Sequence, residues 1–175
     1  MNRIITIFTL LALFLTGCNN STDKDVKSDI VENDEMELIF PKGELISNNY
    51  FQGKAWLSRL VTDVENFDTT VGNVIFEPGA RNNWHSHPGG QILLCISGKG
   101  YYQEKGKSIH LVNVGDVVEI RPNIVHWHGA APDSYFEHIA ISPQQSKGGV
   151  VWLDPVTVEE YNISYTNRND TAGQN

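Results

Sequence analysis

The amino-acid sequence predicts an all-β fold in which one small β-barrel or β-sandwich forms the whole domain. Short apolar or alternating segments follow one another from residue 38 to about residue 142, and turn-forming residues separate them. Many short strands with such regular turns are typical of a sandwich or a barrel. A chain of 175 residues has room for one such domain and not for two.

Seven segments are the expected strands, because apolar, β-branched and aromatic residues dominate them. They are residues 55–61, 71–76, 91–96, 100–104, 108–111, 117–120 and 135–141. Residues that favour turns separate these segments, at Pro78-Gly79, Pro88-Gly89-Gly90, Ser97-Gly98, Lys105-Gly106-Lys107, Gly115-Asp116, Arg121-Pro122-Asn123 and Pro132-Asp133. One short helix is expected over residues 156–161, directly after Pro155.

The first 18 residues have the pattern of an export signal. Arg3 supplies a positive charge, and residues 4–15 form an apolar segment that is too short to span a bilayer. The run that ends at Cys18 (Leu-Thr-Gly-Cys) resembles the lipobox of bacterial lipoproteins, in which the cysteine is lipidated. We therefore expect an exported lipoprotein of the cell envelope, anchored to a membrane through Cys18 and facing the periplasm or the outside. The alternative is an ordinary secretory signal in which Cys18 falls there by chance.

The charge of the chain excludes nucleic acid as a partner. The net charge is -8 and the pI is near 5.1, whereas phosphate binding needs clustered lysine and arginine. Residues 19–37 hold seven acidic residues and two lysines, which predicts a flexible acidic tether. We place the folded domain at residues 38–165 and a polar tail at residues 166–175. Cys95 is the only cysteine besides Cys18, so we expect no internal disulfide and a buried thiol.

The chemistry is concentrated in the histidines. Four of the six form two pairs, His85-x-His87 and His126-x-His128. Residues two apart on a strand point to the same face, so each pair can direct both imidazoles at one point. Gln91 follows the first pair after a turn, so its side chain can point from the next strand to the place where the imidazoles meet. Imidazole suits zinc, copper, iron and nickel, and oxygen ligands extend the choice to manganese. The pattern predicts a site for one divalent transition metal.

These residues resemble the two motifs of the cupin family. The first motif matches at Gly79, His85, His87, Gln91 and Gly98, and the second at Gly115, Pro122 and His126. The resemblance covers about residues 40–142 and implies a small cupin β-barrel, the jelly roll also called a double-stranded β-helix. Gln91 stands where the first motif usually has glutamate. Asn123 stands where the second usually has glycine, and asparagine tolerates a positive φ better than most residues.

Residues 76–91 and 126–130 are similar to the manganese-dependent cupin hydroxynitrile lyases, a group related to cupins associated with carboxymuconolactone-decarboxylase-like proteins. The resemblance implies that three histidines and one glutamine bind the metal, at His85, His87, Gln91 and His126. It implies Mn(II) first, with Fe(II), Ni(II) and Zn(II) as alternatives. It also implies two further histidines near the metal, His128 and His138, as catalytic residues. Cupins of this size commonly pair through the N-terminal strand, so a homodimer is implied as well.

The replacement of a ligand glutamate by Gln91 affects the type of reaction that a bound metal would favour. Three imidazoles and one carboxamide leave the metal charge uncompensated, which favours a Lewis acid that attracts an anion. Gln91 cannot accept a proton, so proton transfer falls to His128 or His138. The alternative for His128 is a partner of the metal ligands without a role in proton transfer, and the alternative for His138 is a hydrogen-bonded core histidine. We expect a metal-dependent enzyme with lyase-type chemistry on a small polar molecule. The alternatives are a metal-dependent oxygenase and a non-catalytic sugar- or metal-binding lipoprotein.

Other conspicuous side chains have plainer expected roles. Arg81 is expected to face solvent from a loop. Four aromatic residues are expected to pack the barrel rather than to line a binding site: Trp84, Tyr101, Tyr102 and Trp127.

Overall fold

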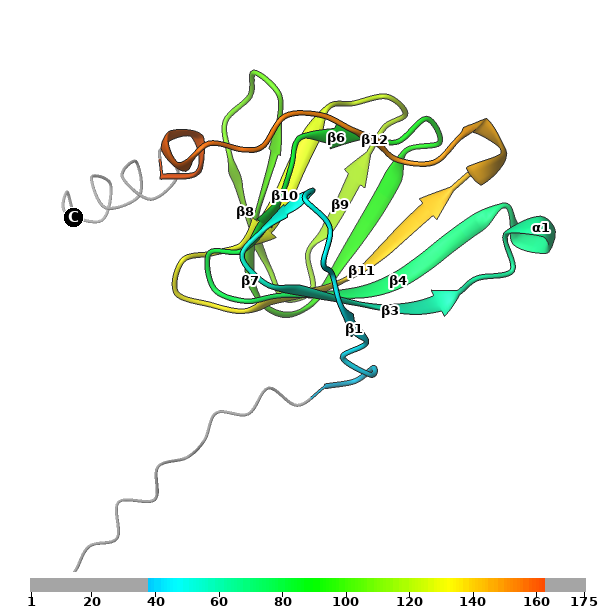
Figure 1. Cartoon of the computed structure of the whole chain (residues 1–175), viewed down its shortest axis with the longest axis horizontal. Coiled ribbons are helices and arrows are strands. Elements are labelled where there is room, and N and C mark those ends of the chain that lie inside the picture. The colour runs from blue at the N-terminus through cyan, green and yellow to red at the C-terminus, as the bar shows by residue number, and fades with distance from the viewer. Residues whose placement is uncertain (1–37, 163–175) are drawn as a thin grey trace, which may run out of the picture. The chain divides into compact units, whose positions relative to one another are not determined.

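The structure is a computed structural model that describes residues 38–162, and it confirms the all-β fold (Figure 1). Its strands are β1 (Glu44–Leu45), β2 (Phe51–Gln52), β3 (Ala55–Val61), β4 (Thr69–Phe76), β5 (Arg81–Asn82), β6 (His85–Ser86), β7 (Gln91–Glu104), β8 (His110–Asn113), β9 (Val117–Ile120), β10 (His126–Ala130), β11 (Phe136–Pro143) and β12 (Val151–Trp152). The helical elements are α1 (Val64–Phe67), the 3-10 helix η1 (Gln145–Lys147) and residues 158–162. The last of these confirms the expected C-terminal helix.

Several predictions concern residues outside this range. The export signal with Cys18, the acidic tether over residues 19–37 and the polar tail over residues 166–175 lie outside the described residues. Residues 163–165, the last three of the predicted domain, also lie outside the described residues. Among residues 38–162, no helix has the length and apolar character needed to cross a membrane.

The strands form two antiparallel sheets that share β7. The first sheet has the order β1, β3, β4, β11, β7 and β9. The second sheet has the order β8, β7, β10, β5 and β2, and β6 joins it by pairing with β10 and β12. Figure 1 shows β3, β4 and β11 on one side of the barrel and β6, β10 and β12 on the other.

Strand β7 corrects one prediction. Two strands were expected, with a turn at Ser97-Gly98 between them, but the structure has a single strand of 14 residues. Its first part pairs with β9 and β11 in the first sheet, and its last part pairs with β8 and β10 in the second. Gly98 lies at the change of sheet with φ +71°, and a Cβ there would meet the carbonyl of Tyr135. The turn-forming residues therefore bend the strand without ending it.

Two smaller predictions are confirmed. Asn123 has φ 63°, the left-handed conformation that glycine adopts in the usual motif. Cys95 is buried and free, and burial raises the pKa of its thiol to about 11. A thiol with such a pKa is protonated at neutral pH and behaves as a small apolar side chain.

Two apolar clusters lie on opposite faces of the second sheet. The interior cluster fills the barrel between the sheets, and its buried members are Ala55, Val74, Phe76, Ala80, Leu93, Cys95, Tyr102, Val112, Ile120, Ala130 and Phe136. The outer cluster consists of Trp84, Tyr101, Trp127, Ala131, Val156 and Tyr161. The expected packing role is therefore confirmed for all four aromatic residues: Trp84, Tyr101 and Trp127 pack in the outer cluster, and Tyr102 packs in the interior cluster.

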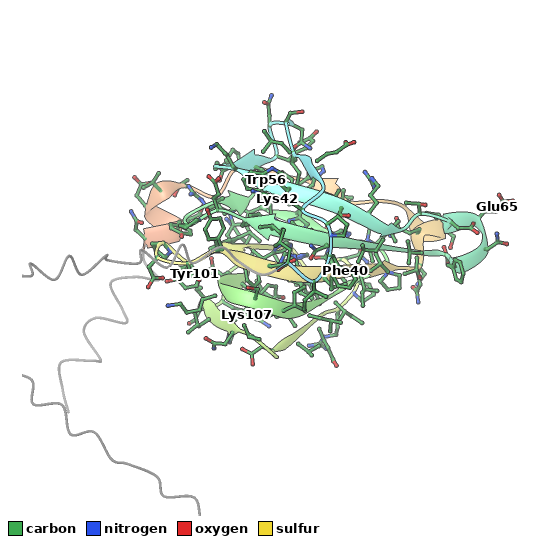
Figure 2. The ribbon with its side chains drawn as sticks, turned by 90° about the horizontal axis from the view of Figure 1, so that it is seen from below. Phe40, Lys42, Trp56, Glu65, Tyr101 and Lys107 are labelled. Atoms are coloured by element: carbon green, nitrogen blue, oxygen red, sulfur yellow. The ribbon has the colours of Figure 1, made fainter. Side chains whose placement is uncertain are left out.

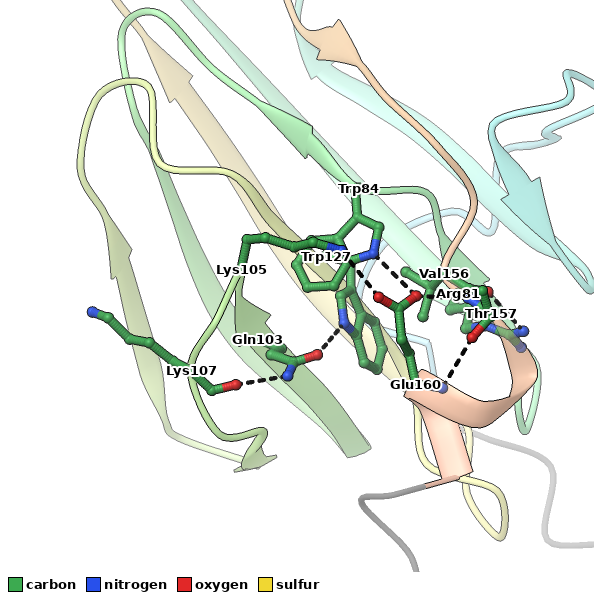
Figure 3. A network of polar contacts seen from close by, with 9 residues as sticks. All are labelled: Arg81, Trp84, Gln103, Lys105, Lys107, Trp127, Val156, Thr157 and Glu160. Carbon is green, nitrogen blue, oxygen red and sulfur yellow. Dashed lines mark hydrogen bonds and ion pairs between the residues drawn. The ribbon is translucent and has the colours of Figure 1, made fainter.

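The C-terminal helix covers the outer cluster (Figure 3). Thr157 and Glu160 form a capping box, in which Glu160 N donates to Thr157 Oγ1 at 3.1 Å and Thr157 N donates to Glu160 Oε2 at 2.9 Å. Trp84 Nε1 also donates to Glu160 Oε2, at 3.3 Å. Tyr161 continues the attachment, because its hydroxyl donates to Ala130 O at 2.8 Å.

The outer face of the first sheet carries a third, more exposed tryptophan. Ala55 and Leu57 pack against the interior cluster, so Trp56 between them points outward. Its ring is half-buried and lies 3.6 Å from the Lys42 ammonium (Figure 2).

Candidate metal centre

The register of the second sheet places the histidines in rows on its interior face. His126 pairs with His85 on one side and with Glu104 on the other, and Trp152 pairs with His85. Directly paired residues in antiparallel strands point to the same face. One row therefore runs from Trp152 through both histidines to Glu104, and His128 lies in the next row opposite Tyr102.

Backbone carbonyls orient two of the imidazoles. His85 Nδ1 lies 2.9 Å from Asn83 O, and His126 Nδ1 lies 2.9 Å from Ile124 O. A carbonyl oxygen only accepts, so each Nδ1 carries the proton and each Nε2 keeps its lone pair. Such bonds fix the ring orientation of metal-binding histidines. His85 and His126 are thus arranged to bind through Nε2, and their rings are 4.1 Å apart.

His87 and Gln91 complete the group that the sequence predicted. The His87 ring lies 5.2 Å from that of His85, and its Nε2 is buried with no hydrogen-bond partner in the described part of the chain. Gln91 Oε1 lies 3.2 Å from His126 Nε2, while Gln91 Nε2 donates to Ser142 Oγ at 3.4 Å. The oxygen and the imidazole nitrogen facing each other are both lone-pair atoms. A cation between them would turn this repulsion into attraction.

The residues fit a divalent transition metal. The ligand atoms of His85, His126 and His128, all buried, lie within 4.8 Å of one another. Three buried histidines can therefore hold a metal, but this group has His128 where the sequence predicted His87. His87, with its orphaned Nε2, and the Oε1 of Gln91 offer alternative donors. An N- and O-donor set of this kind accepts manganese, iron, nickel or zinc.

His128 is less suited to be a ligand than His87. Asn82 Oδ1 accepts a hydrogen bond from His128 N at 2.9 Å, which turns the Asn82 amide nitrogen toward His128 Nε2 at 3.0 Å. The Nε2 lone pair therefore accepts from Asn82, and Nδ1 carries the ring proton. Neither nitrogen has a free lone pair, so His128 stands beside the site as a hydrogen-bond donor.

Burial keeps these imidazoles neutral. Loss of hydration lowers the pKa of His87 to about 4 and that of His126 to about 4. The pKa of His85 and that of His128 lie well below the usual value, first because of burial and then because of neighbouring histidines. Neutral imidazole is the form that binds metal, so protons do not compete for these ligands at neutral pH.

His138 lies deeper, on β11 of the first sheet. Its ring stacks on Phe136 at 4.7 Å and meets the His128 ring edge-on at 4.9 Å. Both of its nitrogens are buried without a hydrogen-bond partner among residues 38–162. Burial lowers the pKa of His138 to about 3. A neutral histidine with an unused lone pair is a proton acceptor held away from water, and an unpaired buried polar group of this kind costs about 1–3 kcal/mol.

Two residues of the site, Asn82 and Trp152, were not predicted from the sequence, and Arg81 lies in a different environment from the predicted one. Asn82 fixes the tautomer of His128, and its position three residues before His85 was a signal that a motif search could have used. Trp152 packs on His85 at 4.9 Å from a distant strand, and no local pattern indicates it. Arg81 does not face solvent freely, because its guanidinium donates to Val156 O at 3.2 Å and lies on the Tyr161 ring.

Comparisons with known proteins agree with this architecture. The cupin domain model matches residues 72–141. An (R)-mandelonitrile lyase of Granulicella tundricola is 44% identical over 89 residues, which are 51% of this chain and 68% of the relative. The crystal structure of a cupin-like protein from Thermotoga maritima has a TM-score of 0.71 and 53% identity, covering 73% of this chain and 97% of that one. A polyketide cyclase of Streptomyces resistomycificus has a TM-score of 0.56 at 12% identity, covering 75% of this chain and 94% of that one, which shows the fold alone.

Proposed function

This chain belongs to the cupin family, and from that premise we propose that it is a metal-dependent lyase that breaks or forms a carbon–carbon bond in a small molecule. The observation that carries the proposal is the approach of Gln91 Oε1 to His126 Nε2 at 3.2 Å, beside the orphaned nitrogen of His87. The (R)-mandelonitrile lyase relative supports the reaction type.

In this proposal His85, His87, Gln91 and His126 hold one divalent metal, with manganese first and iron, nickel or zinc as alternatives. All four side chains are uncharged in the form that binds. When bound there, the metal supplies a Lewis acid whose full charge attracts a carbonyl oxygen, an alkoxide or cyanide. Elemental analysis of the purified protein identifies the metal.

His138 is the proposed proton acceptor and His128 the donor that orients the substrate. For a cyanohydrin, the hydroxyl proton goes to His138, and the bond to the cyano carbon breaks with its electron pair leaving on cyanide. The hydroxyl carbon becomes a carbonyl carbon. Because burial lowers the pKa of His138 to about 3, this imidazole would accept the hydroxyl proton only if a bound metal made the hydroxyl more acidic, and it would then pass the proton to cyanide, which forms hydrogen cyanide.

The test is the cleavage of mandelonitrile by the manganese-loaded protein, with and without oxygen. We expect turnover that does not need oxygen. His138→Ala should retain metal and lower the rate by about 10²–10⁴-fold, because a positioned acid–base group typically contributes that much. His110→Ala, at an exposed histidine, is the matched control and should keep both metal and rate. A stoichiometric need for oxygen would establish an oxygenase instead, and no turnover of any small cyanohydrin would favour a binding protein.

The proposal includes a lipid anchor at Cys18, supported by the lipobox pattern. Cys18→Ser should release the protein from the membrane fraction, because the modified residue is lost. Tight association of this variant with membranes after a high-salt wash would show that another segment holds the protein there.

A further inference from the structure

The carbonyl that holds the imidazole of His85 belongs to Asn83, which lies in the two-residue break between β5 and β6. Asn83 N donates to Tyr50 O at 2.8 Å, next to β2. Trp84 N instead donates to Asp154 O at 3.0 Å, next to β12. The chain changes its pairing partner between these two residues, so the Asn83 carbonyl lies at the point where regular strand pairing is interrupted.

The Asn83 side chain bridges the two partners at this point. It is 3% exposed, and its Nδ2 donates to Leu153 O at 3.4 Å and to Asn49 O at 3.5 Å. One amide group therefore joins the segment before β2 to the segment after β12. Its Oδ1 accepts a hydrogen bond from Gln52 Nε2. The reverse orientation of the amide would point Oδ1 at two carbonyl oxygens, which only accept, so these contacts favour a single orientation.

His126 shows what the Asn83 side chain adds. The His126 Nδ1 also donates to the carbonyl two residues earlier, at Ile124. The Ile124 side chain packs against the interior cluster, so apolar contacts hold that carbonyl in place. At Asn83 the same task falls to hydrogen bonds with two segments that lie outside residues 72–141, the part of the chain that the cupin domain model matches. His85 thus depends on a polar side chain for an orientation that His126 obtains from apolar packing.

We propose that Asn83 is a positioning residue of the metal centre. By joining the segments at Asn49 and Leu153, its side chain holds its own carbonyl against His85 Nδ1. This contact keeps the ring proton on Nδ1 and leaves the Nε2 lone pair directed toward the other ligands. The inference rests on the proposed metal site, because it assigns a role toward one ligand of that site.

Titration of the metal-free protein with Mn(II), followed by calorimetry, tests the consequence for binding. Asn83→Ala should lower the affinity by about 10–100-fold, as the loss of an outer partner of a metal ligand typically does. Asn83→Asp has the same shape and keeps the acceptor for Gln52. It has no N–H group for the two carbonyls, so it should lower the affinity at least as much.

Asn73→Ala is the matched control. Asn73 is also fully buried, but it lies on β4 in the first sheet, where its Nδ2 donates to Glu137 Oε1 at 2.8 Å. This variant loses a buried asparagine and its hydrogen bond without touching the segment that holds His85. It should therefore leave the affinity for Mn(II) unchanged.

Nitrogen NMR of the metal-free proteins separates positioning from a general loss of stability. The shifts of the ring nitrogens report which nitrogen of each histidine carries the proton. The natural sequence should show the proton on Nδ1 in both His85 and His126. In Asn83→Ala and Asn83→Asp, His85 should become a mixture of the two tautomers, whereas His126 should keep its Nδ1 proton. In Asn73→Ala both histidines should remain as in the natural sequence.

Gln52→Ala is a milder variant for the case that Asn83→Ala does not fold. It removes one hydrogen bond to Asn83 and should lower the affinity for Mn(II) several-fold. An unchanged His85 tautomer in the folded variants, or an equal loss of affinity in Asn73→Ala, would overturn the positioning role. Absence of Mn(II) binding by the natural sequence would overturn the metal proposal alone, because the His85 tautomer is measured without metal and still decides whether Asn83 holds that ring.

Discussion

His126 and His128 point into the barrel from strand β10, whereas Trp127 between them points out of it. On the interior face, buried nitrogens of His87, His128 and His138 lack hydrogen-bond partners in the described structure. On the outer face, Trp127 Nε1 donates to Gln103 Oε1 at 2.8 Å (Figure 3). One strand of five residues therefore contributes to two surfaces that differ in hydrogen bonding: buried nitrogens are unpaired on the interior face, and the buried indole N–H is paired on the outer face.

This difference in hydrogen bonding indicates that the interior face serves the function of the protein and that the outer face serves its stability. Each unpaired buried polar group costs about 1–3 kcal/mol, so a face that keeps several of them is not optimised for folding. The outer cluster satisfies its polar atoms and buries large rings, which stabilises the domain. Substitutions of the proposed ligands on the interior face should therefore remove the metal without unfolding the protein. Substitutions in the outer cluster should unfold the protein more easily without removing the metal.

The largest effect is expected for His126→Ala. This variant loses the nitrogen that faces Gln91, and we expect metal retention to fall from about one ion per chain to background, a loss of more than about 100-fold in affinity. Elemental analysis after gel filtration measures the retained metal, and circular dichroism checks the fold. His110→Ala, which changes an exposed histidine, should retain the metal. Full occupancy in His126→Ala would exclude the proposed ligand set.

Trp127→Ala tests the outer face. The ring is fully buried against Trp84 and Tyr161, so its loss should lower the free energy of unfolding by about 3–5 kcal/mol. Denaturant unfolding of the metal-free protein measures the change. At low temperature the folded fraction should still bind one metal per chain. If Trp127→Ala lost metal while keeping its stability, the two faces would not be separate.

Acid sensitivity provides a finer test of the interior face. The pKa of His138 is about 3 in the folded state and about 6.5 in the unfolded state. Below pH 6.5 the unfolded chain therefore binds a proton that the folded protein excludes, and stability falls as the pH is lowered from about 7 toward 3. At pH 5.5 this one group costs about 1.4 kcal/mol. Both metal-free proteins should lose stability between pH 7.5 and 5.5. The loss in free energy of unfolding should be about 1.4 kcal/mol smaller for His138→Leu than for the natural sequence. Parallel losses in the two proteins would show that His138 is not buried as a neutral group.

The sequence predicted the β-fold because strand and turn signals are local. Strands such as β3 and β9 (Ala55–Val61 and Val117–Ile120) were predicted with their exact bounds. The bend in β7 was not predicted, because the Ser97-Gly98 pair looks the same in the sequence whether it ends a strand or only bends one that passes between two sheets. The structure brings together His85, His87, Gln91 and His126, which motif spacing had grouped. Trp152 could not be predicted, since its pairing with His85 depends on how a distant segment closes the sheet.

Strand β7 has one more consequence for the site. A straight strand of its length would span roughly 45 Å, yet Gln91 at its start lies against His126 and Glu104 at its end pairs with the same residue. The bend at Gly98 brings both ends of the strand to the same histidine. The position of Gln91 beside His126 therefore depends on the backbone conformation at Gly98 as well as on the side chains themselves.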